Sequence, residues 1–213
     1  MPADTCVCST RELYYCKQLG ETMRSMLFYD TENKVFASLL KNLKYSTDRG
    51  SEKFLSRELS REILILFAKN GEFAKDWCVT YPPRRKSAVR FYGFDQAREM
   101  ARRISKYTGM TFEEAFSRRG AAAQKALGRE ERKQNAEDSF SLKRGASVRG
   151  KKYVIVDDVV TSGATMKACQ TILLSNGASA AFVLSVSKTP MRGAGYDAKL
   201  RFRKKKDKAW FNG

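Results

Sequence analysis

Two adjacent carboxylates, Asp157 and Asp158, follow an apolar run in a chain of 213 residues that has only 23 acidic side chains. A buried pair of like charges is unfavourable unless a cation or a hydrogen-bond donor meets it, so this placement is a first indication of function. The loop of residues 160–165 then enters a predicted helix, whose first N–H groups and positive dipole end point outward. Because the loop adds hydroxyl donors and a glycine, it predicts a phosphate-binding site made by Thr161, Ser162, Gly163, Ala164 and Thr165.

One ligand that presents a monophosphate to this loop and hydroxyl groups to the two carboxylates is a ribose 5-phosphate. The loop lacks the lysine and the four-residue gap of a Walker A loop, so hydrolysis of a nucleoside triphosphate is not favoured. In the alternative interpretation Asp157 caps a turn and the hydroxyl groups cap the following helix, without any ligand.

The elements around this loop predict how it is positioned. Residues 153–156 predict a buried strand, and the residues after the loop predict a helix that ends at Asn176 and Gly177. Another strand is predicted near residues 180–186, and a short strand at residues 77–81 is halted by Pro82 and Pro83.

Three further helices are predicted upstream. The first begins near Asn33, and the second ends at Gly71. The third has Asp95 as its N-cap. Their apolar faces are given by Phe36, Leu39, Leu40 and Leu43, then by Leu55, Leu59, Ile63 and Leu66, and then by Ala97, Met100, Ala101 and Ile104. Strands that alternate with helices predict an α/β fold with one parallel sheet flanked by helices.

The composition restricts the partners. The net charge of +18 favours polyanions such as nucleic acid, nucleotides or phosphorylated sugars, with a solvated basic surface as the alternative. The five cysteines form no even framework, and no apolar leader precedes them, so we expect a reducing, cytoplasmic setting. The longest apolar runs are far shorter than a membrane helix, so no membrane partner is expected.

Residues 153–165 resemble the complete signature with which type I phosphoribosyltransferases bind phosphoribosyl pyrophosphate (PRPP): apolar residues, two acids, two apolar residues and Thr-Ser-Gly-x-Thr. Three segments, VFASLLKNLKY, YPPRRKSAVRFYGFDQAREMA and RRGAAAQKALGREERKQNAEDSF, are similar to one branch of that superfamily, the ComF-type proteins associated with bacterial DNA uptake. The resemblance extends over residues 33–186 and implies a type I phosphoribosyltransferase-like (Rossmann-like) core.

The resemblance also implies roles for individual residues. Asp157 and Asp158 would hold the ribose hydroxyl groups and favour the positive charge that develops on the sugar in the transition state. Residues 161–165 would bind the 5-phosphate. Arg132 and Asn135 would belong to a mobile lid that excludes water from the reactive centre.

The leaving pyrophosphate, bound to Mg²⁺ as part of Mg–PRPP, would meet the turn after the first predicted strand, at Pro83, Arg84 and Arg85. Ordinary surface charge is the alternative for the two arginines. Three positions depart from the family pattern, because Asp95 replaces the usual Asn, Tyr92 stands where Arg is common, and Ala121 occupies a frequent Thr position.

The resembled family commonly opens with a zinc ribbon of paired Cys-x-x-Cys units. This chain offers Cys6, Cys8 and Cys16 without that spacing and has no histidine, so no structural metal site is expected. We therefore predict a short appendage at residues 1–30, as a degenerate remnant of the ribbon. A phosphoribosyltransferase-like domain follows at 31–200, and a basic tail at 201–213.

Two functions remain after these considerations. The first is phosphoribosyl transfer from Mg–PRPP to an unidentified acceptor. The second is a non-catalytic module on the same fold that senses PRPP or binds nucleic acid, with single-stranded DNA or another polyanion as partner. Proteins of this resemblance are commonly homodimers, although no residue in this chain specifies dimerisation.

Overall fold

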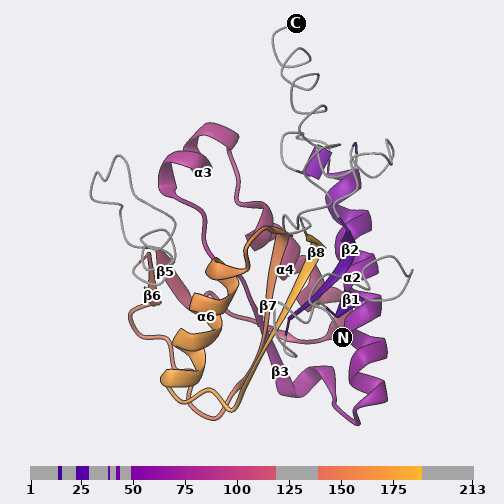
Figure 1. The fold of residues 1–213 in the computed structure, drawn as a ribbon, viewed down its shortest axis with the longest axis vertical. Helices are drawn as coiled ribbons and strands as arrows, with labels where there is room; N and C mark the ends of the chain where they lie inside the picture. Colours follow the sequence, from indigo (N-terminus) through magenta and orange to yellow (C-terminus); the bar gives the residue numbers. More distant parts are fainter. Residues whose placement is uncertain are drawn as a thin grey trace, which may run out of the picture.

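The structure is a computed structural model that describes residues 14–15, 23–28, 38, 42–43, 49–118 and 139–188. Its centre is a six-stranded sheet in the order β1-β2-β8-β7-β3-β4 (Figure 1). All neighbouring strands are parallel except β1 and β2. The strands are β1 (Tyr14–Tyr15), β2 (Met23–Phe28), β3 (Trp77–Thr80), β4 (Thr111–Phe112), β7 (Lys152–Val160) and β8 (Ala180–Lys188). The parallel α/β sheet predicted from the sequence is confirmed.

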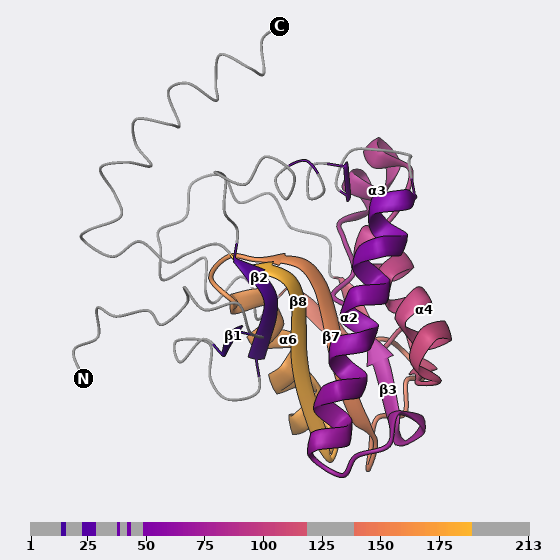
Figure 2. The same ribbon diagram turned by 90° about the vertical axis from the view of Figure 1, so that its right-hand side faces the viewer.

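Helices cover both faces of the sheet. Two long helices, α2 (Gly50–Lys69) and α4 (Gln96–Thr108), lie on one face, and α6 (Ala164–Ser175) lies on the other (Figure 2). Three smaller elements complete the described fold: a single turn, η1 (Ala74–Asp76), a short helix, α3 (Lys86–Tyr92), and a hairpin of β5 (Phe116–Arg118) and β6 (Phe140–Leu142). None of the helices in the described ranges is long and apolar enough to cross a membrane.

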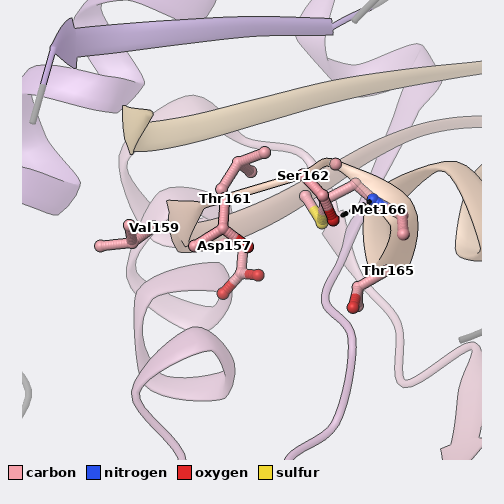
Figure 3. A pocket seen from close by; sticks show the side chains of 9 residues that line it. Asp157, Val159, Thr161, Ser162, Thr165 and Met166 are labelled. Carbon is pink, nitrogen blue, oxygen red and sulfur yellow. Dashed lines mark hydrogen bonds between the residues drawn. The ribbon is translucent and has the colours of Figure 1, made fainter. Parts of the chain in front are cut away.

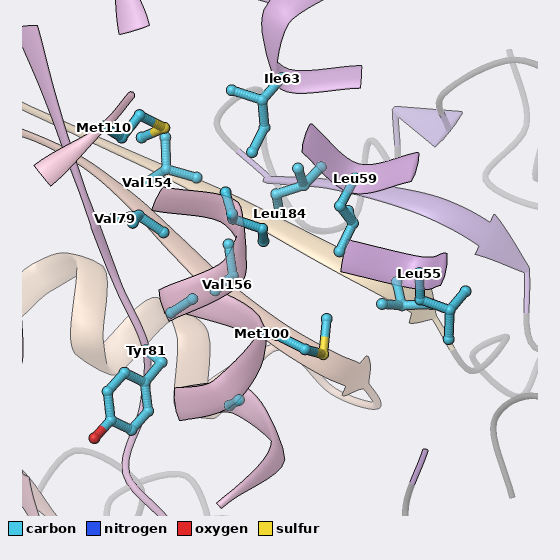
Figure 4. Close-up of a cluster of buried hydrophobic side chains, with 14 of the residues drawn as sticks. Leu55, Leu59, Ile63, Val79, Tyr81, Met100, Met110, Val154, Val156 and Leu184 are labelled. Carbon is cyan, nitrogen blue, oxygen red and sulfur yellow. The ribbon is translucent and has the colours of Figure 1, made fainter. Parts of the chain in front are cut away.

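The sheet separates two apolar clusters because successive side chains of a strand point to opposite faces. On β7, Val154 and Val156 belong to the cluster under α2 and α4, whereas Tyr153 and Ile155 belong to the cluster under α6. Figure 4 shows the first cluster, in which side chains of α2 and α4 meet those of β3, β7 and β8. A core on each face fixes β7 as a central strand and so fixes the direction in which its last residues emerge.

The helical periodicity predicts most of the buried faces. In α4 all four predicted apolar residues are buried, and the Asp95 side chain accepts a hydrogen bond from the Arg98 N–H, as an N-cap does. In α2 the fourth buried position is Phe67, and the predicted Leu66 is only partly buried, because a strict spacing of four residues from Leu55 leads to Phe67.

Gly71 ends α2 as predicted. It has a positive φ of 67°, and its N–H and that of Glu72 donate to the carbonyl groups of Ala68 and Phe67. This pair of bonds is a Schellman motif, which satisfies carbonyl groups of the last turn.

The amino-terminal part differs from the prediction. Within the predicted appendage of residues 1–30, β2 pairs with β8 in the central sheet, and the Ser25 and Ser185 hydroxyl groups are hydrogen-bonded at 2.6 Å. This part of the segment is therefore a strand of the core. The predicted strand at residues 77–81 corresponds to β3, which is not the first strand of the sheet in chain order. Cys6, Cys8 and Cys16, most of the first predicted helix and the basic tail lie outside the described residues.

Candidate functional site

The order of the strands places a topological switch point between the carboxyl ends of β3 and β7. From β3 the chain continues through α4 to β4, towards one edge of the sheet, and from β7 it continues through α6 to β8, towards the other edge. These two connections leave neighbouring strands in opposite directions and pack on opposite faces. In open α/β sheets a ligand binds at such a topological switch point, outside the carboxyl ends of the strands.

The two carboxylates lie on β7 at this switch point. The strand continues to Val160, so Asp157 and Asp158 lie within it and not after its end. Asp158 donates its N–H to the Asp157 carboxylate at 2.8 Å, and Val159 donates its N–H to the Asp158 carboxylate at 2.7 Å. Beyond the carboxylates the alternation of the strand is reversed, because Val159 packs on the α2 and α4 side and Val160 on the α6 side.

The unfavourable electrostatic interaction expected between the adjacent carboxylates Asp157 and Asp158 is present in the structure. Burial and then the neighbouring Asp158 charge raise the pKa of Asp157 well above its ordinary value, while Arg84 acts in the opposite direction. The cation required by the sequence argument is Arg84, whose Nη2 atom lies 3.5 Å from Oδ2 of Asp158. Asp158 is only 7% exposed, so this contact joins the turn after β3 to the end of β7 in a largely desolvated position.

The predicted phosphate loop forms a small hollow of about 50 Å³. The hollow is lined by Asp157 and by residues 159–166, which include all five predicted loop residues (Figure 3). Gly163 has a φ of 76°, a conformation that glycine adopts without strain, and α6 begins directly after it. The Ser162 hydroxyl accepts a hydrogen bond from the Ala164 N–H at 3.4 Å, so the loop is folded locally as a helix start beside Asp157.

Asp95 holds the turn after β3. Its carboxylate accepts one hydrogen bond from the Arg84 N–H at 2.9 Å and a second from the Arg98 N–H at 3.4 Å. The Arg84 guanidinium lies 5.7 Å from the centre of the Tyr92 ring. The backbone of the turn is thus attached to the start of α4, while the Arg84 side chain reaches Asp158 on β7.

Arg118, the last residue of β5, is not among the site residues predicted from the sequence. Its Nη1 atom donates to the Pro83 carbonyl at 3.3 Å, and its guanidinium lies 4.9 Å from the centre of the Phe140 ring. The hairpin that carries it is attached to α4 through Glu114. Hydrogen bonds from Lys143 and then Arg98 lower the pKa of Glu114 to about 2. In the sequence Arg118 stands at the start of a strongly charged run and is followed by another arginine. Nothing in this local pattern distinguishes Arg118 from an ordinary surface arginine.

The structure therefore brings the carboxylates, the phosphate loop and the turn of residues 83–85 together at the carboxyl ends of β3 and β7. Binding of a ligand there stays a prediction. Arg132 and Asn135, the predicted lid residues, lie outside the described residues. In the part of the chain that is described, no cluster of three or more metal-ligating side chains is present.

One protein family and several curated proteins are similar to this chain in sequence. The model of the family "Phosphoribosyl transferase domain" matches residues 90–212. DNA utilization protein YhgH of Escherichia coli K12 is 33% identical over 153 residues, which are 71% of this chain and 66% of that protein. The chain thus spans about two thirds of the length of this relative.

Two solved structures resemble the fold at 20% identity, each over 70% of this chain and 30% of the other. The allosteric regulatory enzyme of purine biosynthesis has a TM-score of 0.46. Glutamine PRPP amidotransferase from B. subtilis has a TM-score of 0.45.

Proposed function

Because the chain belongs to the phosphoribosyl transferase domain family, as a ComF-type member of the type I phosphoribosyltransferase superfamily, we propose that it binds Mg–PRPP and transfers its phosphoribosyl group to an acceptor. The observation that carries this proposal is the position of the two carboxylates beside the phosphate loop, at the switch point between β3 and β7. In one small hollow, this arrangement combines a carboxylate that can accept hydrogen bonds from ribose hydroxyl groups with hydroxyl and N–H groups that can donate hydrogen bonds to a phosphate.

In the proposed complex the 5-phosphate lies on the loop of residues 161–165. The ribose hydroxyl groups then donate to Asp157 and Asp158. When the bond to pyrophosphate breaks, the sugar becomes positively charged, and carboxylates fixed in a partly desolvated site stabilise that charge more than water would. Arg84 would exchange its contact with Asp158 for one with the departing pyrophosphate, since both are anions within reach of the same turn.

Magnesium enters this account as part of the substrate. Its preferred ligands are hard oxygen atoms and water, which the pyrophosphate group supplies, and the adjacent carboxylates are of the same chemical type. When bound, the ion would neutralise charge on the leaving group.

Replacing Asp157 by Asn is expected to lower turnover at least about ten-fold, because an amide stabilises a neighbouring positive charge far less than a carboxylate. The assay is release of pyrophosphate from Mg–PRPP in the presence of a panel of nucleobases and amines. Unchanged turnover in the Asp157→Asn variant would refute the transferase proposal.

A second candidate function is binding of single-stranded nucleic acid, and α3 is the observation that favours it. This helix projects beyond the carboxyl ends of the strands (Figure 1) and has no buried residue. Arg85, Lys86 and Arg90 are exposed on or beside it. Phe91 is 82% exposed, and its ring lies edge-on to that of Tyr92 with centroids 4.9 Å apart. Cations interleaved with exposed aromatic rings are typical of surfaces that stack single-stranded bases.

If single-stranded DNA binds at α3, the logarithm of the affinity for an oligothymidylate should fall linearly with the logarithm of the salt concentration. The slope should be about 0.7 for each phosphate contacted. Phe91→Ala should weaken binding by about ten-fold, since a stacked base contributes roughly 1–3 kcal/mol. Phe73→Ala is the matched control, because Phe73 is also exposed but precedes β3, at the opposite end of the sheet. Equal affinities of both variants and the intact protein would exclude α3 as the binding surface.

A further inference from the structure

Helix α2 carries a stripe of apolar and charged side chains on the face that points away from the core. This outer stripe consists, at successive spacings of four, three and four residues, of Phe54, Glu58, Arg61 and Ile65. At 100° per residue it lies opposite Ile63, which is in the middle of the buried face. Phe54 is 52% exposed and Ile65 is 38% exposed. Figure 2 looks onto this side of the molecule, where α2 lies in front of the sheet.

The described part of the chain provides no partner for the outer stripe. There, α2 packs mainly on α4 and β8, and both lie on its buried side. Glu58 and Arg61 belong to none of the ion pairs found among the described residues. A spacing that alternates between three and four residues is the pattern by which one helix packs along another. The stripe therefore has the form of a helix–helix contact whose second helix is not among the described elements.

The order of the four residues indicates that the second helix is another copy of α2. With two copies antiparallel about a two-fold axis between residues 59 and 60, Phe54 of one copy meets Ile65 of the other. In the same arrangement Glu58 of one copy meets Arg61 of the other. Each contact occurs twice, as a two-fold axis requires, so two apolar contacts flank two ion pairs. A parallel pair in register would instead place like charges opposite each other, which is unfavourable.

The charge of the whole chain restricts the surfaces at which two copies can meet. Most surfaces of a chain with a net charge of +18 repel a second copy. The outer stripe is an exception, because it carries one acid and one base, and the antiparallel arrangement pairs both of them.

We propose that two copies of this chain associate through their outer stripes, with the two α2 helices antiparallel. The inference does not depend on the proposed function, since no residue of the stripe belongs to the candidate site. Packed helices approach to about 8–10 Å, a separation that side chains of this size fill. One helix face buries less surface than a standard interface of about 1,600 Å², so we expect a reversible dimer with a dissociation constant on the order of ten micromolar.

The test exchanges charges between the copies, with self-association measured by sedimentation equilibrium. Glu58→Arg places cations opposite Arg61 of the second copy, and Arg61→Glu places anions opposite Glu58 of the second copy. Each variant alone should associate at least about ten-fold more weakly than the intact protein. In an equimolar mixture of the two variants, both facing pairs have opposite charges. The mixture should therefore form a mixed dimer with an affinity within about three-fold of that of the intact protein.

Two further variants test the apolar contact. Ile65→Ser should weaken association at least about ten-fold, because the contact is lost twice in each dimer. Leu174→Ser is the matched control, since Leu174 is similarly exposed but lies on α6, on the other face of the sheet, and it should change the dissociation constant by less than about two-fold. All these side chains are at the surface, so circular dichroism should show that each variant is folded.

Three results would overturn the proposal. The first is an intact protein that stays monomeric up to about 100 µM, ten times the expected dissociation constant. The second is a dimer that is unaffected by Glu58→Arg and Ile65→Ser. The third is a mixture of the two charge variants that associates no more tightly than either variant alone, because that result would exclude the antiparallel pairing of Glu58 with Arg61.

Discussion

The Asp157→Asn variant is expected to be more stable than the intact protein at neutral pH while it loses affinity for Mg–PRPP. The pKa of Asp157 is raised by burial and by the adjacent Asp158, so the ionised carboxylate is unfavourable in the folded state. An amide of the same shape removes that charge. We expect a gain of about 1 kcal/mol, which corresponds to roughly 2–4 °C in Tm for a chain of this size.

The pH dependence of this gain has a definite sign. A carboxyl group whose pKa is raised by folding contributes stability at a pH below its unfolded value, and that contribution is lost as the pH rises through its folded value. The Tm difference between Asp157→Asn and the intact protein should therefore be larger at about pH 8 than at about pH 4.5. It is measured by thermal unfolding followed by circular dichroism.

Asp158→Asn provides the neighbouring control. Asp158 accepts the contact from Arg84, so its replacement relieves the repulsion with Asp157 but also removes a favourable partner of a cation, and the Tm should rise less than in Asp157→Asn. A stabilisation by Asp158→Asn equal to that by Asp157→Asn, or a Tm difference for Asp157→Asn that does not depend on pH, would contradict this description of the pair.

The Asp95→Ala variant is expected to lose both stability and ligand affinity. The Asp95 carboxylate caps α4 and also accepts the hydrogen bond from the Arg84 N–H, so alanine removes two interactions. Loss of an N-cap and of one further hydrogen bond amounts to about 2 kcal/mol, or roughly 4–8 °C in Tm. Because the turn is then no longer held against α4, affinity for Mg–pyrophosphate should fall by about ten-fold in calorimetric titration.

Asp95→Asn distinguishes positioning of the turn from helix capping alone. The asparagine amide keeps one oxygen that accepts hydrogen bonds and caps helices about as well as aspartate, so most of the stability should return. Because the N–H groups of Arg84 and Arg98 bind different oxygen atoms of Asp95, asparagine cannot keep both contacts, and the affinity for pyrophosphate should stay low. If Asp95→Ala lowers the Tm but leaves pyrophosphate affinity unchanged, the role of Asp95 is limited to the helix.

The elements that sequence analysis predicted are those with a long periodic signal. The α4 helix has four apolar residues at helical spacing and an N-cap, and β8 is an apolar run, so both are predicted close to where they are observed. The start of β7 is predicted as well, but the strand continues to Val160, beyond the predicted end at Val156. The strands β1 and β4 contain two residues each, and β2 has mixed polarity. Only pairing with the rest of the sheet makes these segments strands, and a single sequence does not contain that information.

The candidate site shows the same division. The carboxylates and the phosphate loop are contiguous in sequence, so their chemistry could be predicted without the fold. Arg118 is 35 residues from Pro83 and 39 from Asp157, and it is in their neighbourhood because the hairpin packs against α6 and its base is attached to α4. No local pattern predicts that meeting, because it depends on the order of strands in the sheet.

The most direct test of the central claim is calorimetric titration of Mg–PRPP into the intact protein and into the Asp157→Asn/Asp158→Asn double variant. We expect a dissociation constant on the order of micromolar for the intact protein and no measurable binding for the double variant, which should still unfold cooperatively. Absence of binding to the intact protein, or equal binding to both proteins, would contradict a PRPP site at the carboxyl ends of β3 and β7.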